Sequence, residues 1–339
     1  RKFLKGVGVI ALLTGFALLI GVLSGSRDVL QPLSKINFAS AGVESNGEVA
    51  MYPNGHLPFQ RVKSVAELDE IILQSKDKYI MVDFYADKGA TGLTILGIMG
   101  EAGKLSTDES ESVIRRVVAR NELPVIVGVS APGLAAMRTL ATSAMEIGAV
   151  GVMVAPPWTL RTDAQILSFY RDVSQTLGDI PFVLQDFPLV TNVVISAETI
   201  LKIVADCPNC VMLKHEDWPG LDKITTLRAA CDAGARRISI LCGNGGQFLP
   251  EELRRGADGA MTGFAYPEMM AGVVAAHRAG DADHAQDIFD AYLPIVRYES
   301  QPGLGLGVRK YILARRGAIA HDAVRKPGKP LSTNTIREL

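Results

Sequence analysis

The sequence predicts an α/β protein, a (β/α)8 TIM barrel that lacks its first strand and follows an N-terminal transmembrane helix and a linker. Short apolar runs typical of buried strands recur after residue 88, segments with helical spacing lie between them, and a glycine precedes several runs. The runs are residues 93–96, 125–129, 151–154, 182–184, 211–213, 238–241 and 260–262. Strands that alternate with helices indicate a parallel sheet, and seven such units in a row favour a barrel, which needs eight. An open doubly wound sheet is the alternative.

The N-terminal segment is the most apolar part of the chain. Residues 6–25 carry no charge, and their number matches the thickness of a bilayer's hydrocarbon core. We interpret residues 1–25 as a transmembrane helix that makes the protein a single-pass membrane protein. Arg1, Lys2 and Lys5 precede the apolar run, which would leave the rest of the chain outside the cytoplasm. A signal peptide is the competing interpretation, and because the sequence begins with Arg1 we expect a processed form or a fragment.

Two short regions separate this segment from the barrel. Residues 26–62 are rich in Gly, Pro, Ser and Asn and are interpreted as a linker. Residues 63–87 begin with a helix-capping pattern at Ser64 and Glu67 and end in a stretch, 79–87, that is rich in β-forming residues. That stretch lies too close to the strand at 93–96 for a parallel crossover, which needs about a dozen residues. We therefore expect residues 79–87 to be helical and the barrel to be open between its second and eighth strands.

Composition places residues 88–339, the barrel with its C-terminal helices, among ordinary globular domains. The whole chain is 48% apolar and 21% charged, and its net charge of -1 argues against a nucleic-acid partner. Four cysteines in 339 residues do not form a disulfide framework. We expect neither a metal nor a cofactor.

Lys214 is the main candidate for catalysis. It follows the apolar residues 211–213 and so stands at the carboxyl end of a buried strand. Burial disfavours the ammonium form, so a neutral, nucleophilic amine becomes accessible, as a Schiff base with a carbonyl substrate requires. His215 and Glu216 are candidates for setting the environment of the lysine. The alternative is a structural lysine that extends from the strand end to water.

Further candidates follow the other strands, where the active residues of a barrel lie. Residues 97–101 contain two glycines, which permit a tight turn whose Ile98 and Met99 amides face a carboxylate. The candidates for substrate binding are Gly97, Ile98, Met99, Gly100, Glu101, Trp158, Gly243 and Asn244, and Gln185 joins Lys214 as a candidate catalytic residue.

From about residue 87 onward the sequence resembles the dihydrodipicolinate synthase / N-acetylneuraminate lyase family of class I aldolases. The matching motifs are Gly97-x-x-Gly-Glu101, the strand that ends in Lys214, Gly243-Asn244, and Arg254-Arg-Gly-Ala-Asp-Gly259. The resemblance implies a Schiff base between Lys214 and a 2-keto acid of the pyruvate type, with the substrate carboxylate held by the Gly97 loop. It also implies a homo-oligomer, a tetramer, and a cytoplasmic location for the barrel as the alternative to membrane anchoring.

Three positions depart from the family pattern. Ile98 and Met99 stand where the family usually has two hydroxyl residues, and Gln185 stands where it has a tyrosine. A Gln-Asp pair at this place is similar to the family's 2-keto-3-deoxy sugar acid dehydratases, so we expect aldol cleavage or condensation, or dehydration of such an acid. Gln185 cannot act as a general base, which leaves it a hydrogen-bonding role. The 4-hydroxy-tetrahydrodipicolinate synthase of lysine biosynthesis is the alternative.

Residues 1–87 carry a second resemblance, to the membrane segment and the start of the thioredoxin-like domain of a DsbD-type thiol:disulfide interchange protein. The matching stretches are residues 24–33, 62–68 and 82–87. In that family a Trp-Cys-x-x-Cys motif follows directly, whereas Lys88 and Gly89 follow here, so the redox centre is absent. The sequence therefore looks like a junction of two genes, and a non-catalytic, membrane-anchored remnant of such a protein is a further alternative.

Overall fold

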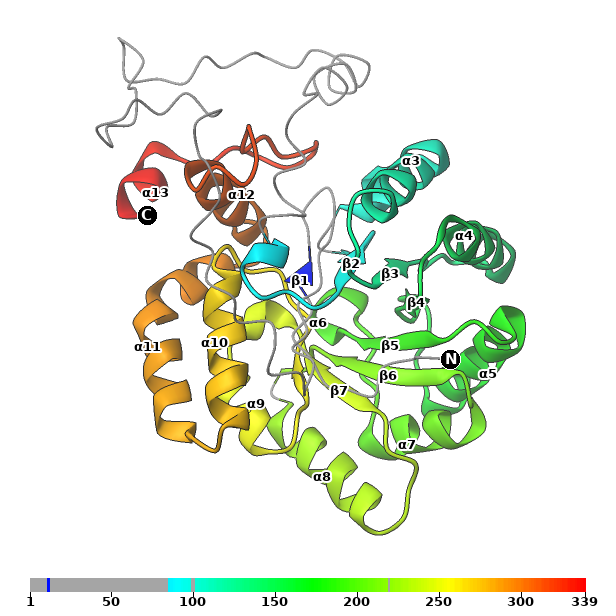
Figure 1. The fold of residues 1–339 in the computed structure, drawn as a ribbon. Coiled ribbons are helices and arrows are strands. Elements are labelled where there is room, and N and C mark those ends of the chain that lie inside the picture. The colour runs from blue at the N-terminus through cyan, green and yellow to red at the C-terminus, as the bar shows by residue number, and fades with distance from the viewer. Residues whose placement is uncertain (1–10, 13–84, 99–100, 219) are drawn as a thin grey trace. The chain divides into compact units, whose positions relative to one another are not determined.

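The computed structural model describes residues 11–12, 85–98, 101–218 and 220–339, and its centre is a parallel sheet of eight strands in the order β1 to β8 (Figure 1). The strands are β1 (Ala11–Leu12), β2 (Leu93–Ile95), β3 (Val125–Gly128), β4 (Gly151–Val154), β5 (Phe182–Asp186), β6 (Cys210–His215), β7 (Ser239–Cys242) and β8 (Gly259–Ala260). Each strand pairs in parallel with the next one along the chain. The seven predicted runs therefore all form strands, and their ends differ from the prediction by at most two residues.

From β2 to β8 helices connect consecutive strands, α10 follows β8, and these helices lie around the outer side of the curled sheet, as in a TIM barrel (Figure 1). They are η2 (Ala102–Lys104), α3 (Thr107–Val118), α4 (Leu134–Ile147), α5 (Asp163–Leu177), α6 (Pro188–Thr191), α7 (Ala197–Asp206), α8 (Leu221–Asp232), η3 (Asn244–Gly246), α9 (Leu249–Arg254) and α10 (Pro267–Arg278). The C-terminal helices are α11 (Ala282–Glu299), α12 (Gly305–Arg315) and α13 (Thr333–Glu338). Capping boxes begin α3 at Ser106 and α5 at Thr162, and Gly148, with a φ of 117°, ends α4.

The sheet separates two apolar regions. One side packs against the helices, and the other encloses a compact interior cluster of six side chains. These six are Ile126, Met153, Val183, Met212, Leu241 and Met261. Because side chains alternate along a strand, Gln185 and Lys214 point to the same side as Val183 and Met212. The interior cluster thus forms a floor beneath these two polar side chains at the carboxyl ends of β5 and β6.

The first strand corrects two expectations. Ala11 and Leu12 form β1 and pair with Leu93 and Thr94 of β2, so the prediction of a barrel without its first strand is wrong. The prediction of a helix over residues 6–25 is wrong at these two residues, and the other residues of that range lie outside those described. An uncharged apolar run suits a strand buried on both faces of a parallel sheet as well as a membrane helix, so hydrophobicity alone did not separate the two.

Between β8 and β1 the residues that the structure describes form no pairing, so the gap in the sheet lies there and not between the second and eighth strands. In the part of the chain with described coordinates, no helix is both long enough and apolar enough to cross a membrane.

Residues 85–87 are helical, which confirms that part of the expectation for residues 79–87. Tyr85 is fully buried, and its hydroxyl donates a hydrogen bond of 3.0 Å to the carbonyl of Phe264. The remaining residues of the stretch, the linker at 26–62 and almost all of the segment that resembles an interchange protein lie outside the described residues.

Candidate functional site

Lys214 lies inside the barrel with a side chain that is 1% exposed. Its Nζ is 3.0 Å from Oε2 of Glu216, which is 2% exposed. Burial lowers the pKa of Lys214, the neighbouring Glu216 carboxylate opposes that change, and the positive charge of Arg309 adds to the lowering. The neutral amine is therefore closer to neutral pH than in an exposed lysine, as the sequence predicted from the strand-end position alone.

Glu216 is the centre of the site. Its Oε2 contacts Nζ of Lys214 and also accepts a hydrogen bond of 2.7 Å from Nε2 of Gln185. Its Oε1 accepts a hydrogen bond of 3.2 Å from the backbone amide of Asn244. A Cβ atom on Gly243 would lie 2.2 Å from Cγ of Glu216, so only glycine leaves room for the carboxylate at this point. Gly243 and Asn244 thus contact Glu216, and their predicted contact with the substrate stays a prediction.

Gln185 approaches from the neighbouring strand, in register with Lys214. Its amide nitrogen is bound to Glu216, but its Oε1 is fully buried and has no hydrogen-bond partner among the described residues. Oγ1 of Thr94, on β2, is likewise fully buried and has no hydrogen-bond partner among the described residues. Buried acceptors without partners are costly, so these two oxygens are candidates for hydrogen bonds from a bound molecule.

At Glu101 the loop after β2 is bound to two lysines of the protein. Its Oε1 accepts a hydrogen bond of 2.7 Å from Nζ of Lys104, and its Oε2 accepts one of 2.9 Å from Nζ of Lys310 on α12. Burial alone would raise the pKa of Glu101, but the two lysines outweigh it and lower that pKa. Both carboxylate oxygens are thus used within the protein, and Glu101 ties the end of the loop to α12. Met99 and Gly100 lie outside the described residues.

Trp158 lies on the rim. Its side chain is 66% exposed, and the guanidinium of Arg161 lies 5.9 Å from its ring centre. The structure therefore does not bring Trp158 into the buried part of the site.

Sequence reasoning underestimated Glu216. From the sequence, Glu216 was assigned only the role of setting the environment of Lys214. Its position two residues after Lys214 already indicates that both side chains point to the same face of one strand. The contact of Glu101 with Lys310 had no local signal, because the two residues are 209 positions apart.

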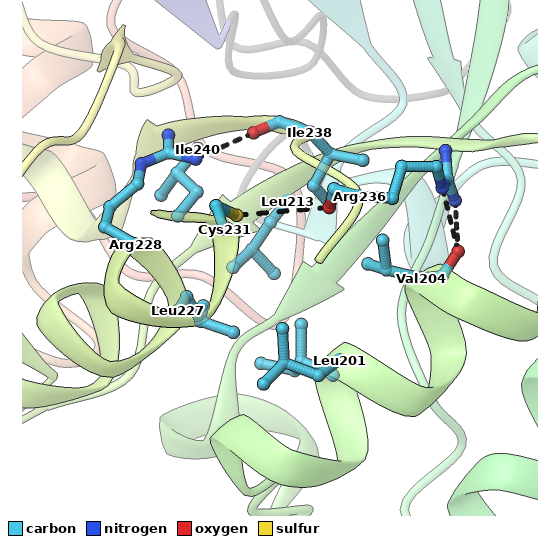
Figure 2. Close-up of a pocket in the computed structure, with 10 residues that line it drawn as sticks. Leu201, Val204, Leu213, Leu227, Arg228, Cys231, Arg236, Ile238 and Ile240 are labelled. Carbon is cyan, nitrogen blue, oxygen red and sulfur yellow. Dashed lines mark hydrogen bonds between the residues drawn. The ribbon is translucent and has the colours of Figure 1, made fainter. Parts of the chain in front are cut away.

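A small pocket lies on the other side of β6, between β6, β7, α7 and α8, and Figure 2 shows its lining. Leu213 lines it, and because Leu213 alternates with Lys214 along the strand, the pocket opens away from the lysine. Its two arginines are already used, since Arg228 donates to the carbonyl of Ile238 and Arg236 to the carbonyl of Val204 (Figure 2). We assign it no role in the site.

Comparison with known proteins agrees with this geometry. The model of the Dihydrodipicolinate synthetase family matches residues 68–339. L-2-keto-3-deoxyarabonate dehydratase of Azospirillum brasilense is 29% identical over 287 residues, which cover 81% of this chain and 88% of that protein. The 4-hydroxy-tetrahydrodipicolinate synthase of Chlorobium phaeovibrioides is 27% identical over 267 residues, 76% of this chain and 86% of that protein.

Among solved structures, the dihydrodipicolinate synthase of Rhodopseudomonas palustris is 53% identical and superimposes with a TM-score of 0.75, over 76% of this chain and 87% of that chain. The family match spans most of the chain, including β2 to β8 and all the described site residues. The chain therefore belongs to the Dihydrodipicolinate synthetase family, whose members are lyases.

Proposed function

We propose that the protein is a Schiff-base lyase that acts on a 2-keto acid through Lys214. The observation that carries the proposal is the buried contact between Lys214 and Glu216 at the carboxyl end of β6. The neutral amine of Lys214 attacks the C2 carbonyl, the carbonyl oxygen leaves as water, and an iminium forms that draws electrons from C3.

Among the reactions open to such an iminium, the site favours dehydration of a 2-keto-3-deoxy sugar acid. Gln185 stands in the place of the family's tyrosine and has no ionisable group, whereas Glu216 is ionisable and its Oε2 lies 3.0 Å from Nζ of Lys214. The Glu216 carboxylate takes a proton from C3 and returns one to the C4 hydroxyl. The C3–H and C4–O bonds break, a C3–C4 double bond forms, water leaves, and Glu216 ends in its original state. Addition of one water molecule to C2 of the iminium then breaks the C–N bond, which releases the dehydrated keto acid and restores the amine of Lys214.

The free Oε1 of Gln185 fits this assignment, because it offers an acceptor to a hydroxyl group of the substrate. The relative in Azospirillum brasilense carries the name of a dehydratase for an acid of this class, which supports the same choice.

Trapping of the Schiff base tests the role of Lys214. Incubation with pyruvate and borohydride should give a covalent adduct, detected by mass spectrometry, in the wild type and in a Lys202→Ala variant, which alters an exposed lysine on α7. Lys214→Ala should form none. An adduct that persists in Lys214→Ala would rule out the proposed nucleophile.

The reaction type is decided by the product formed from a 2-keto-3-deoxy pentonate. Dehydration releases no pyruvate and gives a dehydrated keto acid by NMR, whereas aldol cleavage releases pyruvate, which lactate dehydrogenase detects. We expect the first result, and pyruvate as the main product would overturn the dehydratase assignment while leaving the Schiff base in place.

A second candidate is 4-hydroxy-tetrahydrodipicolinate synthase, because that name is carried by several relatives and a dihydrodipicolinate synthase is 53% identical. The glutamine at position 185 argues against it, since the family's tyrosine takes part in proton relay. Condensation of pyruvate with aspartate semialdehyde, followed by absorbance of the product, tests this candidate directly, and we expect no turnover.

A further inference from the structure

A buried arginine on α12 has no role in the mechanism described so far. Arg309 is 4% exposed, although arginine is almost never fully buried unless it is paired. Its Nε donates a hydrogen bond of 2.7 Å to Oε2 of Glu299, the last residue of α11. The other oxygen of Glu299 accepts the backbone amide of Ala265 at 2.9 Å. Glu299 is thus fully engaged, and it fixes the guanidinium of Arg309 from one side.

The other side of the guanidinium has no hydrogen-bond partner in the part of the chain that the structure describes. Nη1 and Nη2 of Arg309 make no hydrogen bond with the described residues. These two nitrogens are also not among the polar atoms that are both fully buried and without a partner. These nitrogens therefore reach space open to solvent or to a ligand. A guanidinium held through Nε presents its remaining N–H groups as a planar fork, the arrangement that binds a carboxylate through two hydrogen bonds.

The fork lies at the same end of the barrel as Lys214. Ala265 follows β8, and the carboxyl ends of parallel strands converge on one mouth. Lys310, next to Arg309, holds Glu101 at the end of the loop after β2, and Arg316, at the end of α12, donates a hydrogen bond to the carbonyl of Ala265. Helix α12 therefore contacts segments that follow both β2 and β8. The effect of the Arg309 charge on the pKa of Lys214 is consistent with this position.

The substrate carries a group that such a fork binds. A 2-keto acid brings a carboxylate directly beside the carbon that Lys214 attacks. The loop after β2 offers this carboxylate backbone amides, but its apolar side chains, Ile98 and Met99, add neither a positive charge nor a hydroxyl donor. We propose that Arg309 binds the carboxylate of the 2-keto acid through its two terminal nitrogens. The inference rests on the proposed Schiff-base function and adds the residue that selects acids over neutral carbonyl compounds.

The test compares two carbonyl compounds, pyruvate and hydroxyacetone, which lacks the carboxylate. The concentration that gives half-maximal borohydride trapping on Lys214 is measured for each. Arg309→Lys keeps the charge but loses the fork, and the double variant Glu299→Gln/Arg309→Gln removes the pair without leaving a lone buried carboxylate. Arg315→Gln, at the exposed end of the same helix, is the matched control.

We expect the half-saturating pyruvate concentration to rise about 10- to 100-fold in both Arg309 variants, which is the effect of losing a charged hydrogen-bonded contact. The value for hydroxyacetone should change less than about threefold, because that compound makes no such contact. A loss of packing or of the positive charge near Lys214 affects both compounds alike, so an equal change in both, or an unchanged value for pyruvate, overturns the role of Arg309.

The two proposals fail in distinguishable ways. If the wild type forms no adduct with either compound, the Schiff-base function is wrong and the assignment of Arg309 falls with it. If the wild type forms the adduct and the preference for pyruvate survives in both Arg309 variants, only the assignment of Arg309 is overturned. A cooperative thermal transition in each variant shows that the comparison is made on folded protein.

Discussion

Glu216 joins three parts of the site, because one carboxylate contacts the Lys214 amine, the Gln185 amide and the backbone of Asn244. Such a group can orient the lysine and also move a proton. The two roles are separable, since formation of the Schiff base needs the amine, whereas elimination needs a base near C3.

We expect Glu216→Gln to form the trapped pyruvate adduct but to lower the turnover of a 2-keto-3-deoxy acid by about 10²- to 10⁴-fold, the usual contribution of a general acid–base group. Mass spectrometry of the adduct and NMR of the product measure the two steps. Glu198→Gln, on the exposed start of α7, is the control. Turnover within a few-fold of the wild type would exclude Glu216 as the proton carrier.

A second buried carboxylate controls stability and not chemistry. Burial raises the pKa of Glu252, on α9, from 4.5 to about 8, although the hydrogen bond with Cys242 acts in the opposite direction and lowers it. Because the folded state holds this proton more tightly than the unfolded state, the stabilising contribution is complete below pH 4.5 and is lost as pH rises to about 8.

Between pH 5 and 8 the free energy of unfolding of the wild type should therefore fall relative to that of Glu252→Gln, by at most about 1.4 kcal/mol per pH unit. Denaturant titrations of both proteins at several pH values measure the difference. Parallel pH profiles for the two proteins would mean that Glu252 is ionised in the folded state.

At the scale of elements, the sequence predicted what local patterns encode. Apolar runs separated by helical segments predicted seven strands, and the end of the run at residues 211–213 predicted the position of Lys214. It failed at residues 11–12, because an apolar run is compatible with a strand and with a membrane helix. It also gave no sign of the contact between Glu101 and Lys310, which is formed only when α12 folds back over the barrel. The role of Arg309 was missed for the same reason.

The link between α12 and the loop after β2 gives an element-scale prediction. Lys310 donates to Glu101 and to the carbonyl of Ala323. Lys310→Met removes both contacts but leaves Lys104 on Glu101, so we expect a loss of about 1–3 kcal/mol in the free energy of unfolding. The loop end also loses its anchor, so the half-saturating pyruvate concentration should rise.

Denaturant unfolding and borohydride trapping measure the two effects, and Lys310→Arg should restore part of each. Lys329→Met, an exposed lysine of the C-terminal segment, is the control. If Lys310→Met destabilises the protein but leaves pyruvate binding unchanged, α12 supports the fold without positioning the loop.

At the scale of the whole molecule, four exposed apolar side chains follow the carboxyl ends of two neighbouring strands. Trp158 follows β4, and Leu189, Val190 and Val194 follow β5, its neighbour in the sheet, with exposed fractions between 44% and 67%. An exposed apolar group of this kind marks an interaction surface. Since the family is typically oligomeric, we expect this surface, defined by these four residues, to contact a second copy of the chain.

In a two-fold symmetric interface each substitution occurs twice, once on each partner. Leu189→Asp/Val194→Asp therefore places four carboxylates in the contact, where their desolvation and mutual repulsion should shift the protein to a smaller assembly. Light scattering after size-exclusion chromatography measures the mass. Leu293→Asp, which alters an exposed leucine on α11, should leave the mass of the wild type unchanged. A wild-type monomer, or a double variant with the mass of the wild-type oligomer, would show that this surface does not hold the subunits together.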